Sequence, residues 1–334
     1  MIQSKYSICY FIPYFGKLPQ GFPMWLLSCS TNITVNWILM TDDKTEYRYP
    51  PNVRVIYCSF EDVQKRIKEF YPFPTVLDRP WKLCDYKPAY GEIFAEELAG
   101  YDFWGHCDMD LIWGDIRKFI TDDMLDQYDK IGFQGHSTLY RNTPEVNARY
   151  QTILEDELTY QDIFQSSYGH CFDEDLINKI YQKLNIPYYT GINFAHFDPL
   201  TNSFFLEFFP EEDNYKNRRQ VFVWENGKIK RYYLHNKKIY SDEEFMYLHT
   251  FKRPIVYKAE GYVPDKMYVM YPDVLKEIRR EDLTYNFINH KGKCSAFRYY
   301  VTFAYNYRKK LTIKNVIVSF LNKTKRAIKR GKRY

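Results

Sequence analysis

Two aspartates one residue apart, Asp108 and Asp110, are the residues whose types and spacing point most directly to chemistry. They follow the aromatic run 101–107 and precede the apolar stretch 111–113. In extended backbone two residues so spaced project to the same side, and carboxylates that close repel each other unless a cation lies between them. Mg²⁺ and Mn²⁺ suit that role because they take carboxylate oxygens and often share them with substrate phosphates. The pair therefore predicts a site for a metal–diphosphate, which an enzyme of nucleotide sugars needs.

An Asp-x-Asp pair by itself is also typical of a solvated loop. The aromatic and apolar neighbours argue against that reading here, because two unpaired carboxylates are costly to bury. A bound cation and a specific set of hydrogen bonds remain as the two explanations.

The elements that must position this pair can be read from alternating apolar runs and helical patterns. Four short apolar runs predict strands at residues 6–13, 36–40, 53–58 and 103–107. Helical patterns lie between them at residues 24–32, 60–70 and 87–98. This alternation predicts an α/β fold with a mainly parallel sheet, in which ligands bind at the carboxyl ends of the strands. Four aspartates fall at predicted strand ends: Asp42, Asp43, Asp108 and Asp110.

The second half of the chain is less regular. A strand is predicted at 130–134, and helical stretches at 145–150 and 175–184. Residues 221–234 predict a hairpin that turns at Asn226-Gly227, which we interpret as a small insertion of about residues 200–240. Ser241 with Glu244 predicts a helix start with a capping box, and that helix would lead into residues 247–253.

Charge divides the 334 residues into two parts. The formal net charge is +5, yet no Asp or Glu follows Asp282, and the segment after it holds 14 of the 47 Lys and Arg residues. We therefore expect one domain over residues 1–282 and a basic tail over 283–334. Within the tail, apolar residues at roughly helical spacing predict a basic amphipathic helix on an anionic membrane. A nucleic-acid tail and a solvated, disordered end are the alternatives, and the apolar stripe favours the membrane over nucleic acid.

Cysteine usage and the N-terminus indicate the compartment. Seven scattered cysteines without a Cys-x-x-Cys predict neither a disulfide framework nor a zinc finger. No cleavable signal pattern and no run of about 18 apolar residues occur. We expect a cytoplasmic protein held at the inner face of the membrane by its tail.

The order of these motifs resembles the GT-A glycosyltransferases, and more closely an uncharacterised bacterial group from capsule and O-antigen loci with galactofuranosyltransferase-like members. The resemblance covers roughly residues 5–275, and its most specific part is 82–116. The motifs that carry it are the aromatic first strand, Thr41-Asp42-Asp43, the block 84–91 (Cys-Asp-Tyr-Lys-Pro-Ala-Tyr-Gly), the Asp-x-Asp block and Leu248-His249-x-x-Lys252. It implies a GT-A-like, Rossmann-type nucleotide-binding sheet and a divalent cofactor, Mn²⁺ or Mg²⁺.

The resemblance also implies roles for single residues. Asp110 would be the main metal ligand, with Asp108 touching the metal or the ribose, and His249 completing the metal shell or contacting the diphosphate. Lys252 and Arg253 would neutralise the charge that develops as the diphosphate leaves. The residues expected to line the nucleotide pocket are Pro13, Tyr14, Phe15, Thr41, Asp42, Asp43, Asp85 and Lys87.

Each role has a simpler structural alternative. His249 could be a helix cap or a core residue, and Lys252 a solvated surface lysine. Asp85 could start the helix that follows it. The residues that could serve only to turn the chain are Pro13, Tyr14, Asp42 and Asp43.

The acceptor side would need a general base if transfer inverts the sugar. Asp173 and Glu174 are the candidates, because the base of GT-A enzymes often comes from an acidic residue in this part of the chain. The alternative is an acidic first turn that complements the dipole of the helix at 175–184. His196 would line the acceptor cleft or be a core histidine.

The metal–diphosphate pattern predicts a metal-dependent enzyme of nucleotide sugars, and the resemblance implies a glycosyltransferase that moves a hexose, such as galactofuranose or galactose, from a UDP-sugar to a lipid-linked saccharide in bacterial capsule or O-antigen synthesis. A nucleotidyl- or phosphosugar-transferase would need the same carboxylates and metal, although it would favour a Gly-rich activating loop that the sequence lacks. A non-catalytic binding module of polysaccharide assembly is the third hypothesis.

Overall fold

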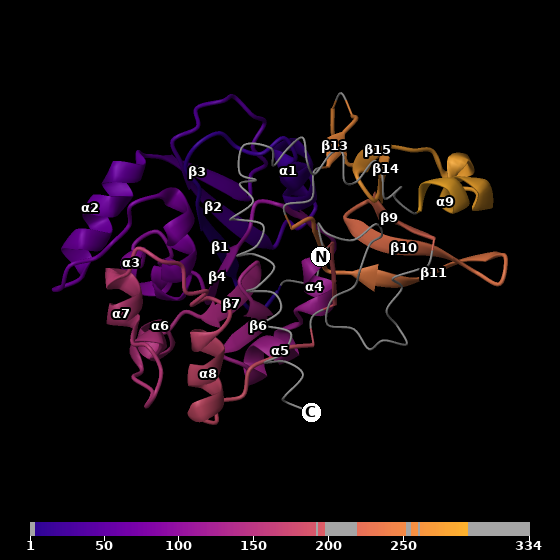
Figure 1. Cartoon of the computed structure of the whole chain (residues 1–334). Coiled ribbons are helices and arrows are strands. Elements are labelled where there is room, and N and C mark those ends of the chain that lie inside the picture. The colour runs from indigo at the N-terminus through magenta and orange to yellow at the C-terminus, as the bar shows by residue number, and fades with distance from the viewer. Residues whose placement is uncertain (1–3, 192, 198–218, 252–254, 260, 293–334) are drawn as a thin grey trace, which may run out of the picture.

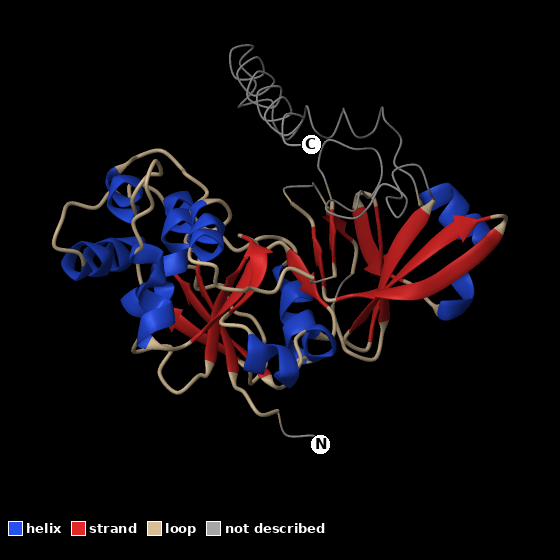
Figure 2. Ribbon diagram, turned by 90° about the horizontal axis from the view of Figure 1, so that it is seen from below, coloured by secondary structure: helices blue, strands red, loops and turns tan. Residues whose placement is uncertain are grey.

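The computed structural model describes residues 4–191, 193–197, 219–251, 255–259 and 261–292. Two groups of elements lie side by side, an N-terminal half of mixed helices and strands and a C-terminal half built mostly of strands (Figure 1). Seen from below, the helices gather around the first sheet, whereas the strands of the second half form a sheet of their own (Figure 2). Within the described ranges, no helix is long and apolar enough to cross a membrane.

The first sheet has six strands, and it contains the strands that the alternation of apolar runs and helical patterns predicted. The strands in spatial order are β3 Val53–Tyr57, β2 Val35–Thr41, β1 Ile8–Pro13, β4 Phe103–Cys107, β7 Ser137–Arg141 and β6 Lys130–Gln134. The first four run parallel, β7 is antiparallel to β4, and β6 is antiparallel to β7. The α/β prediction and all five predicted strands of this region are confirmed.

Both faces of this sheet are buried along β1, β2 and β4, which explains why these strands are mostly apolar. Side chains of β1 alternate between two cores: Cys9 and Phe11 join one, and Ile8, Tyr10 and Ile12 join the other. The helical segments of this half are α1 Phe22–Ser30, α2 Phe60–Phe70, η1 Pro80–Ala89, α3 Tyr90–Ile93, α4 Ile116–Phe119, α5 Asp122–Gln127, α6 Pro144–Ala148, η2 Arg149–Gln151, α7 Tyr160–Gln165 and α8 Leu176–Lys183.

A small sheet of three strands joins the two halves. Its central strand, β12 Tyr247–His249, lies antiparallel to β5 Leu111–Trp113 and parallel to β8 Phe194–His196. The strand that follows the Asp-x-Asp pair is therefore paired with a segment more than 130 residues further along the chain.

The second large sheet contains the predicted hairpin and extends well beyond it. The turn holds Asn226 at φ 49° and Gly227 at φ 75°, which suits the two-residue hairpin expected there. The strands in spatial order are β11 Lys238–Phe245, β10 Lys228–His235, β9 Gln220–Glu225, β14 Met267–Tyr271, β15 Val274–Glu277 and β13 Val256–Tyr257. The hairpin is thus part of a six-stranded sheet.

The end of the described chain packs onto this sheet. A short turn, η3 Arg280–Asp282, leads into α9 Tyr285–Lys291, and Ile288 shares a buried cluster with Val221 and Val223. The first ten residues of the predicted tail therefore belong to the folded body. The amphipathic helix predicted further along lies outside the described residues.

Two predicted helices differ in the structure. Residues 87–89 end a 3-10 segment in which Pro88 lacks a backbone donor, α3 covers only Tyr90–Ile93, and residues 94–98 form turns. The helix predicted from Ser241 is wrong: that residue lies in β11, and β12 follows. Glu243 pairs across the strands with Arg231, and residues 245–250 are buried in succession, as in an interior strand.

Candidate metal centre

Asp108 and Asp110 lie in the turn that leaves the carboxyl end of β4 and enters β5. Hydrogen bonds fix this turn on both sides: the Asp108 amide donates to the carbonyl of His136 at 3.0 Å, and the Thr250 amide donates to the carbonyl of Asp110 at 3.0 Å. Met109, between the two aspartates, is buried. Both carboxylates retain exposed surface, 38% for Asp108 and 34% for Asp110.

His249 reaches the same place from the other half of the molecule. It ends β12 and faces Leu111 of β5 in the antiparallel register, which brings it next to Asp110. Its Nε2 lies 3.4 Å from Asp110 Oδ1. One ligand atom from each of Asp108, Asp110 and His249 lies within 4.8 Å of the others. Two carboxylate oxygens and one imidazole nitrogen form a donor set that fits Mn²⁺ and Mg²⁺.

Lys87 contacts Asp108 of this centre and also a third carboxylate, that of Asp173. Its Nζ is 2.8 Å from Asp108 Oδ1 and 3.1 Å from Asp173 Oδ2, and it donates to the carbonyl of Gly135 at 2.7 Å. Burial lowers the pKa of Lys87, but Asp108 and Asp173 outweigh it and hold this pKa well above its usual value. The lysine is therefore a fixed positive charge between two carboxylates.

Asp173 and Glu174, the candidates for the base, occupy different environments. Burial raises the pKa of Asp173 to about 7, although Lys87 opposes the rise. Glu174 is exposed, and its Oε1 accepts the amide of Gly135 at 3.1 Å. A β-carbon on Gly135 would lie 2.2 Å from Asp173 Oδ2, so a larger residue here would displace the Asp173 carboxylate. The structure thus brings both carboxylates to the turn that holds Lys87.

Asp42 and Asp43, after β2, hold the loop that follows β1. Asp42 accepts the amide of Gly16 at 2.7 Å, and Asp43 accepts that of Leu18 at 2.8 Å. Hydrogen bonds from Thr45 and from the Leu18 amide lower the pKa of Asp43. The two aspartates therefore shape the loop, whatever else they bind.

The three residues that begin this loop have separate environments. Pro13 ends β1, and Tyr14 is half-buried, with its pKa raised by burial and by the charges of Asp110 and Asp43. Phe15 is buried in a core cluster against Phe60, so it packs the fold and does not line a pocket as predicted. Thr41 is also fully buried.

Asp85, which the resemblance placed at the nucleotide, is fully buried. Its side chain has no exposed surface, pairs with Lys82 at 2.7 Å, and accepts the amides of His170 and Phe172. Every contact is internal, so Asp85 holds the segment that leads to Asp173 and does not face a nucleotide. Lys252 and Arg253, the predicted phosphate ligands, lie outside the described residues.

A pocket of about 160 Å³ opens beside Asp110. Burial and the charge of Asp110 raise the pKa of Tyr257 in its wall. The residues that line it are Pro19, Gln20, Gly21, Met109, Asp110, Thr250, Ile255 and Tyr257. It is the space next to the carboxylates in which part of a substrate could lie.

His136 is a site residue that the sequence did not reveal, and His196 had two alternative roles, in the acceptor cleft or in the core. His136 lies in the turn between β6 and β7, and its only signal is a Gly-His pair after a predicted strand. His196 ends β8 and is buried, with Nδ1 at 2.9 Å from His249 Nδ1. Burial lowers the pKa of His196 to about 3 and that of His136 well below its usual value, so both imidazoles are neutral at pH 7.

Comparisons with other proteins give a family and two distant structural likenesses. The model of a family described as a family of unknown function (DUF6625) matches residues 10–279. None of the curated protein sequences is similar enough to match the chain.

Two solved structures are similar over part of the chain. For mouse xyloside xylosyltransferase 1, apo form, the TM-score is 0.35 at 11% identity, covering 58% of this chain and 88% of that one. For the glycosyltransferase GlyE of Streptococcus pneumoniae TIGR4, the TM-score is 0.30 at 10% identity, covering 56% of this chain and 45% of that one. Because both scores are below 0.5, we draw no argument from them.

Proposed function

The chain belongs to the DUF6625 family, whose function is unknown, and for this member we propose a metal-dependent glycosyltransferase that uses a UDP-sugar. The observation that carries the proposal is the meeting of Asp108, Asp110 and His249 at the carboxyl edge of a mainly parallel sheet. Ligands bind at that edge in sheets of this kind. Two ligand types, carboxylate and imidazole, come together there from two distant parts of the sequence, which a solvated Asp-x-Asp loop would not require.

The donor atoms present fit a divalent ion. Asp108 keeps 38% of its side chain exposed although Lys87 contacts one of its oxygens, so it can still offer an oxygen to an ion. When bound, Mn²⁺ or Mg²⁺ would offset the negative charge of a departing diphosphate. His249 would present Nε2 to the ion, because its Nδ1 faces His196.

The surrounding side chains have roles that do not depend on the ion. Lys87 would hold Asp108 in place and keep Asp173 paired, so that the edge of the site does not rearrange when substrate arrives. The loop tied by Asp42 and Asp43 would form the nucleotide side, with Tyr14 half-exposed near Asp110 and Asp43. The pocket beside Asp110 would receive the sugar or part of the diphosphate.

On the acceptor side we assign the base to Glu174 if transfer proceeds with inversion. A general base must reach the acceptor hydroxyl, and Glu174 is exposed, whereas Asp173 is buried against Lys87. Asp173 would then act by positioning Lys87. The sequence offered both Asp173 and Glu174 as the base, and we propose a different role for each of them.

We also propose which acceptor the enzyme uses and where in the cell it acts. A hexose such as galactose or galactofuranose would pass to a lipid-linked saccharide of a bacterial capsule or O-antigen, at the inner face of the membrane. The support is the basic tail, which combines Lys and Arg with an apolar stripe that suits an anionic lipid surface.

The test is release of UDP from a panel of UDP-sugars by the purified chain, with Mn²⁺ and with EDTA. Metal-dependent release from one donor is expected, since slow hydrolysis of the donor needs no acceptor. Release of pyrophosphate instead of UDP would identify a nucleotidyltransferase. No release, together with no Mn²⁺-dependent binding of UDP, would contradict the proposal.

A further inference from the structure

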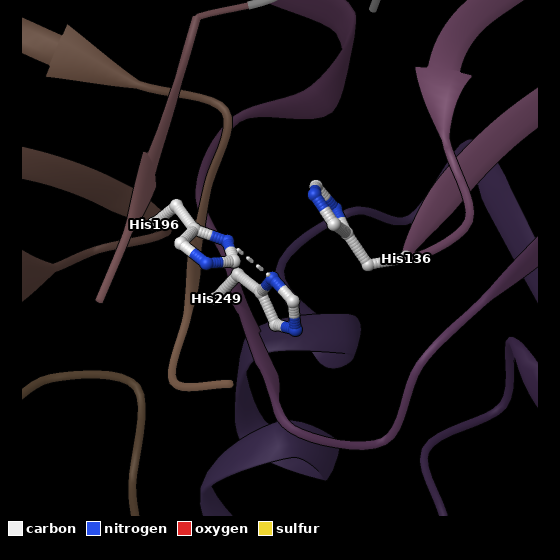
Figure 3. A group of neighbouring side chains, drawn as sticks. All are labelled: His136, His196 and His249. Atoms are coloured by element: carbon white, nitrogen blue, oxygen red, sulfur yellow. Dashed lines mark hydrogen bonds between the residues drawn. The ribbon is translucent and has the colours of Figure 1, made fainter. Parts of the chain in front are cut away.

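We propose that His136, His196 and His249 form a second, nitrogen-rich metal site that binds a borderline transition-metal ion such as Zn²⁺ or Co²⁺. One nitrogen atom of each ring lies within 4.8 Å of the others, and all three side chains are buried. His196 and His249 lie side by side, and His136 approaches from the opposite direction (Figure 3). The inference goes beyond glycosyl transfer and stands on the geometry of the histidines alone.

Three separate elements hold these rings in place. His196 and His249 are register partners in the parallel pair β8 and β12, so the backbone keeps them adjacent. His136 is fixed by its carbonyl, which accepts the amide of Asp108 at 3.0 Å. The ring centroid of His249 lies 4.2 Å from that of His136 and 4.7 Å from that of His196. Ligands carried by strands and a tied turn are pre-positioned, as a metal site requires.

The nitrogens of His136 point to a missing ligand. Nδ1 lies 3.0 Å from the hydroxyl of Tyr247, whereas Nε2 is buried and has no hydrogen-bond partner among the described residues. A buried polar atom without a partner is uncommon in folded proteins. The arrangement matches a metal-binding histidine, in which one ring nitrogen takes the ion and the other is oriented by an outer hydrogen bond.

His196 and His249 are already spaced almost as two ligands of one ion. Their Nδ1 atoms are 2.9 Å apart and share a single proton. Two nitrogens bound at 2.0–2.1 Å to a tetrahedral ion lie about 3.3 Å apart, so a shift of a few tenths of an ångström would admit it. Nε2 of His249 could then donate to Asp110, 3.4 Å away, in the carboxylate–histidine–metal arrangement.

Ligand type separates this site from the carboxylate centre. Neutral imidazole suits Zn²⁺, Co²⁺ and Ni²⁺, whereas carboxylate oxygens suit Mg²⁺ and Mn²⁺. Three protein ligands also leave a fourth position of a tetrahedral ion for water or another molecule. Because His249 can offer only one unprotonated nitrogen at a time, an ion held by the three histidines would take this ligand away from Asp108 and Asp110.

The decisive experiment uses the wild-type chain, freed of any affinity tag and of metal, then loaded with one equivalent of Zn²⁺. X-ray absorption at the zinc edge counts the imidazoles around the ion. Three imidazoles are expected. No more than one imidazole, or no bound zinc after desalting, would overturn the inference. Because this measurement needs no substrate, its result is independent of whether sugar transfer is found.

Two matched variants test the assignment to residues. His136→Gln removes a ligand from the histidine site alone, and Asp108→Asn removes one from the carboxylate centre alone. Co²⁺ binding, followed by its visible absorption, should weaken at least about 10-fold in His136→Gln and remain close to wild type in Asp108→Asn. Mn²⁺ binding should show the reverse order. Co²⁺ binding that is lost in Asp108→Asn and unchanged in His136→Gln would place the ion at the carboxylates and overturn the inference.

Folding and surface binding need their own controls. Far-UV circular dichroism and the unfolding midpoint show whether each variant is folded. His290→Gln, at an exposed position of α9, changes a histidine away from the cluster and should leave Co²⁺ binding unchanged. If His136→Gln does not fold, the imidazole count on the wild-type chain decides the question.

Discussion

Two aspartate–lysine pairs involve residues of the same 3-10 segment, η1, but one pair is buried and the other is partly exposed. The Lys82–Asp85 pair is fully buried, and the carboxylate oxygens of Asp85 accept hydrogen bonds from the lysine and from two backbone amides. Lys87–Asp108 lies five residues further along, yet Asp108 remains 38% exposed and faces Asp110 and His249. The family resemblance implied that Asp85 and Lys87 both face the nucleotide. The difference teaches that the number of internal partners and the exposed surface decide whether such a carboxylate holds the fold or binds a ligand.

The largest expected effect is on turnover, and it comes from a substitution at the partly exposed carboxylates. Asp110→Asn should lower metal-dependent UDP release by about 100-fold or more, because a metal ligand contributes several kcal/mol to the stabilisation of developing charge. The free energy of unfolding should change by less than about 1 kcal/mol, since the side chain is 34% exposed. Steady-state kinetics and urea unfolding measure the two quantities. Asp123→Asn, at an exposed position of α5, is the matched control, and equal turnover of both variants would contradict the comparison.

A substitution in the buried Lys82–Asp85 pair should lower stability and leave metal binding unchanged. Asp85→Ala should cost about 3–5 kcal/mol of unfolding free energy, because it leaves the Lys82 ammonium buried without its partner. Urea unfolding gives the stability, and Mn²⁺ binding measured at low temperature on the folded fraction should stay near wild type. A variant as stable as wild type that has lost Mn²⁺ binding would reverse the roles of the two pairs.

A smaller effect tests the turn that supports Lys87. Gly135→Ala places a β-carbon 2.2 Å from Asp173 Oδ2 and 3.0 Å from Glu174 Cγ. Overpacking of this kind costs about 1–3 kcal/mol, and it should also disturb the Lys87–Asp173 contact. Gly261→Ala is the control, because nothing lies within 4 Å of its new β-carbon. If thermal unfolding shows equal midpoints for the two variants, the close packing of the turn is refuted.

The smallest effect is a dependence of stability on pH. Burial raises the pKa of Asp173 to about 7, whereas an unfolded aspartate titrates near about 4. The native state therefore holds a proton that the unfolded chain releases, so this group's contribution to stability falls as the pH rises from about 4 to about 7. The unfolding free energy of Asp173→Asn, relative to wild type, should accordingly increase between pH 5 and pH 8. A constant difference across that range would show that Asp173 titrates normally.

Local patterns were sufficient for five of the six strands of the first sheet, all except β7, and for one side of the site. The strands at 103–107 and 130–134 and the helix at 60–70 end where the apolar pattern ends, and Ser59 caps that helix through a capping box with Asp62. The Asp-x-Asp pair follows a buried strand, so its position could be read without knowing the fold. His249 was expected from resemblance, and the structure places it beside Asp110.

The rest depends on contacts between distant segments. Tyr247 meets His136 across 111 residues of sequence, and His196 meets His249 across 53, so no local pattern marks the histidine cluster. The stretch from Ser241 satisfies a capping-box rule, but pairing with β10 decides its structure as β11. The burial of Asp85 likewise follows from the segment 168–172 folding over it, which the sequence near Asp85 does not contain.

The central claim is that Asp108, Asp110 and His249 hold a divalent ion on which a nucleoside diphosphate depends. The most direct measurement is calorimetric titration of UDP into the wild-type chain and into Asp110→Asn, each with Mn²⁺ and with EDTA. We predict binding to the wild-type chain only in the presence of Mn²⁺, and no binding to the variant under either condition. UDP that binds the wild-type chain equally well in EDTA, or binds Asp110→Asn as tightly as wild type, would contradict the claim.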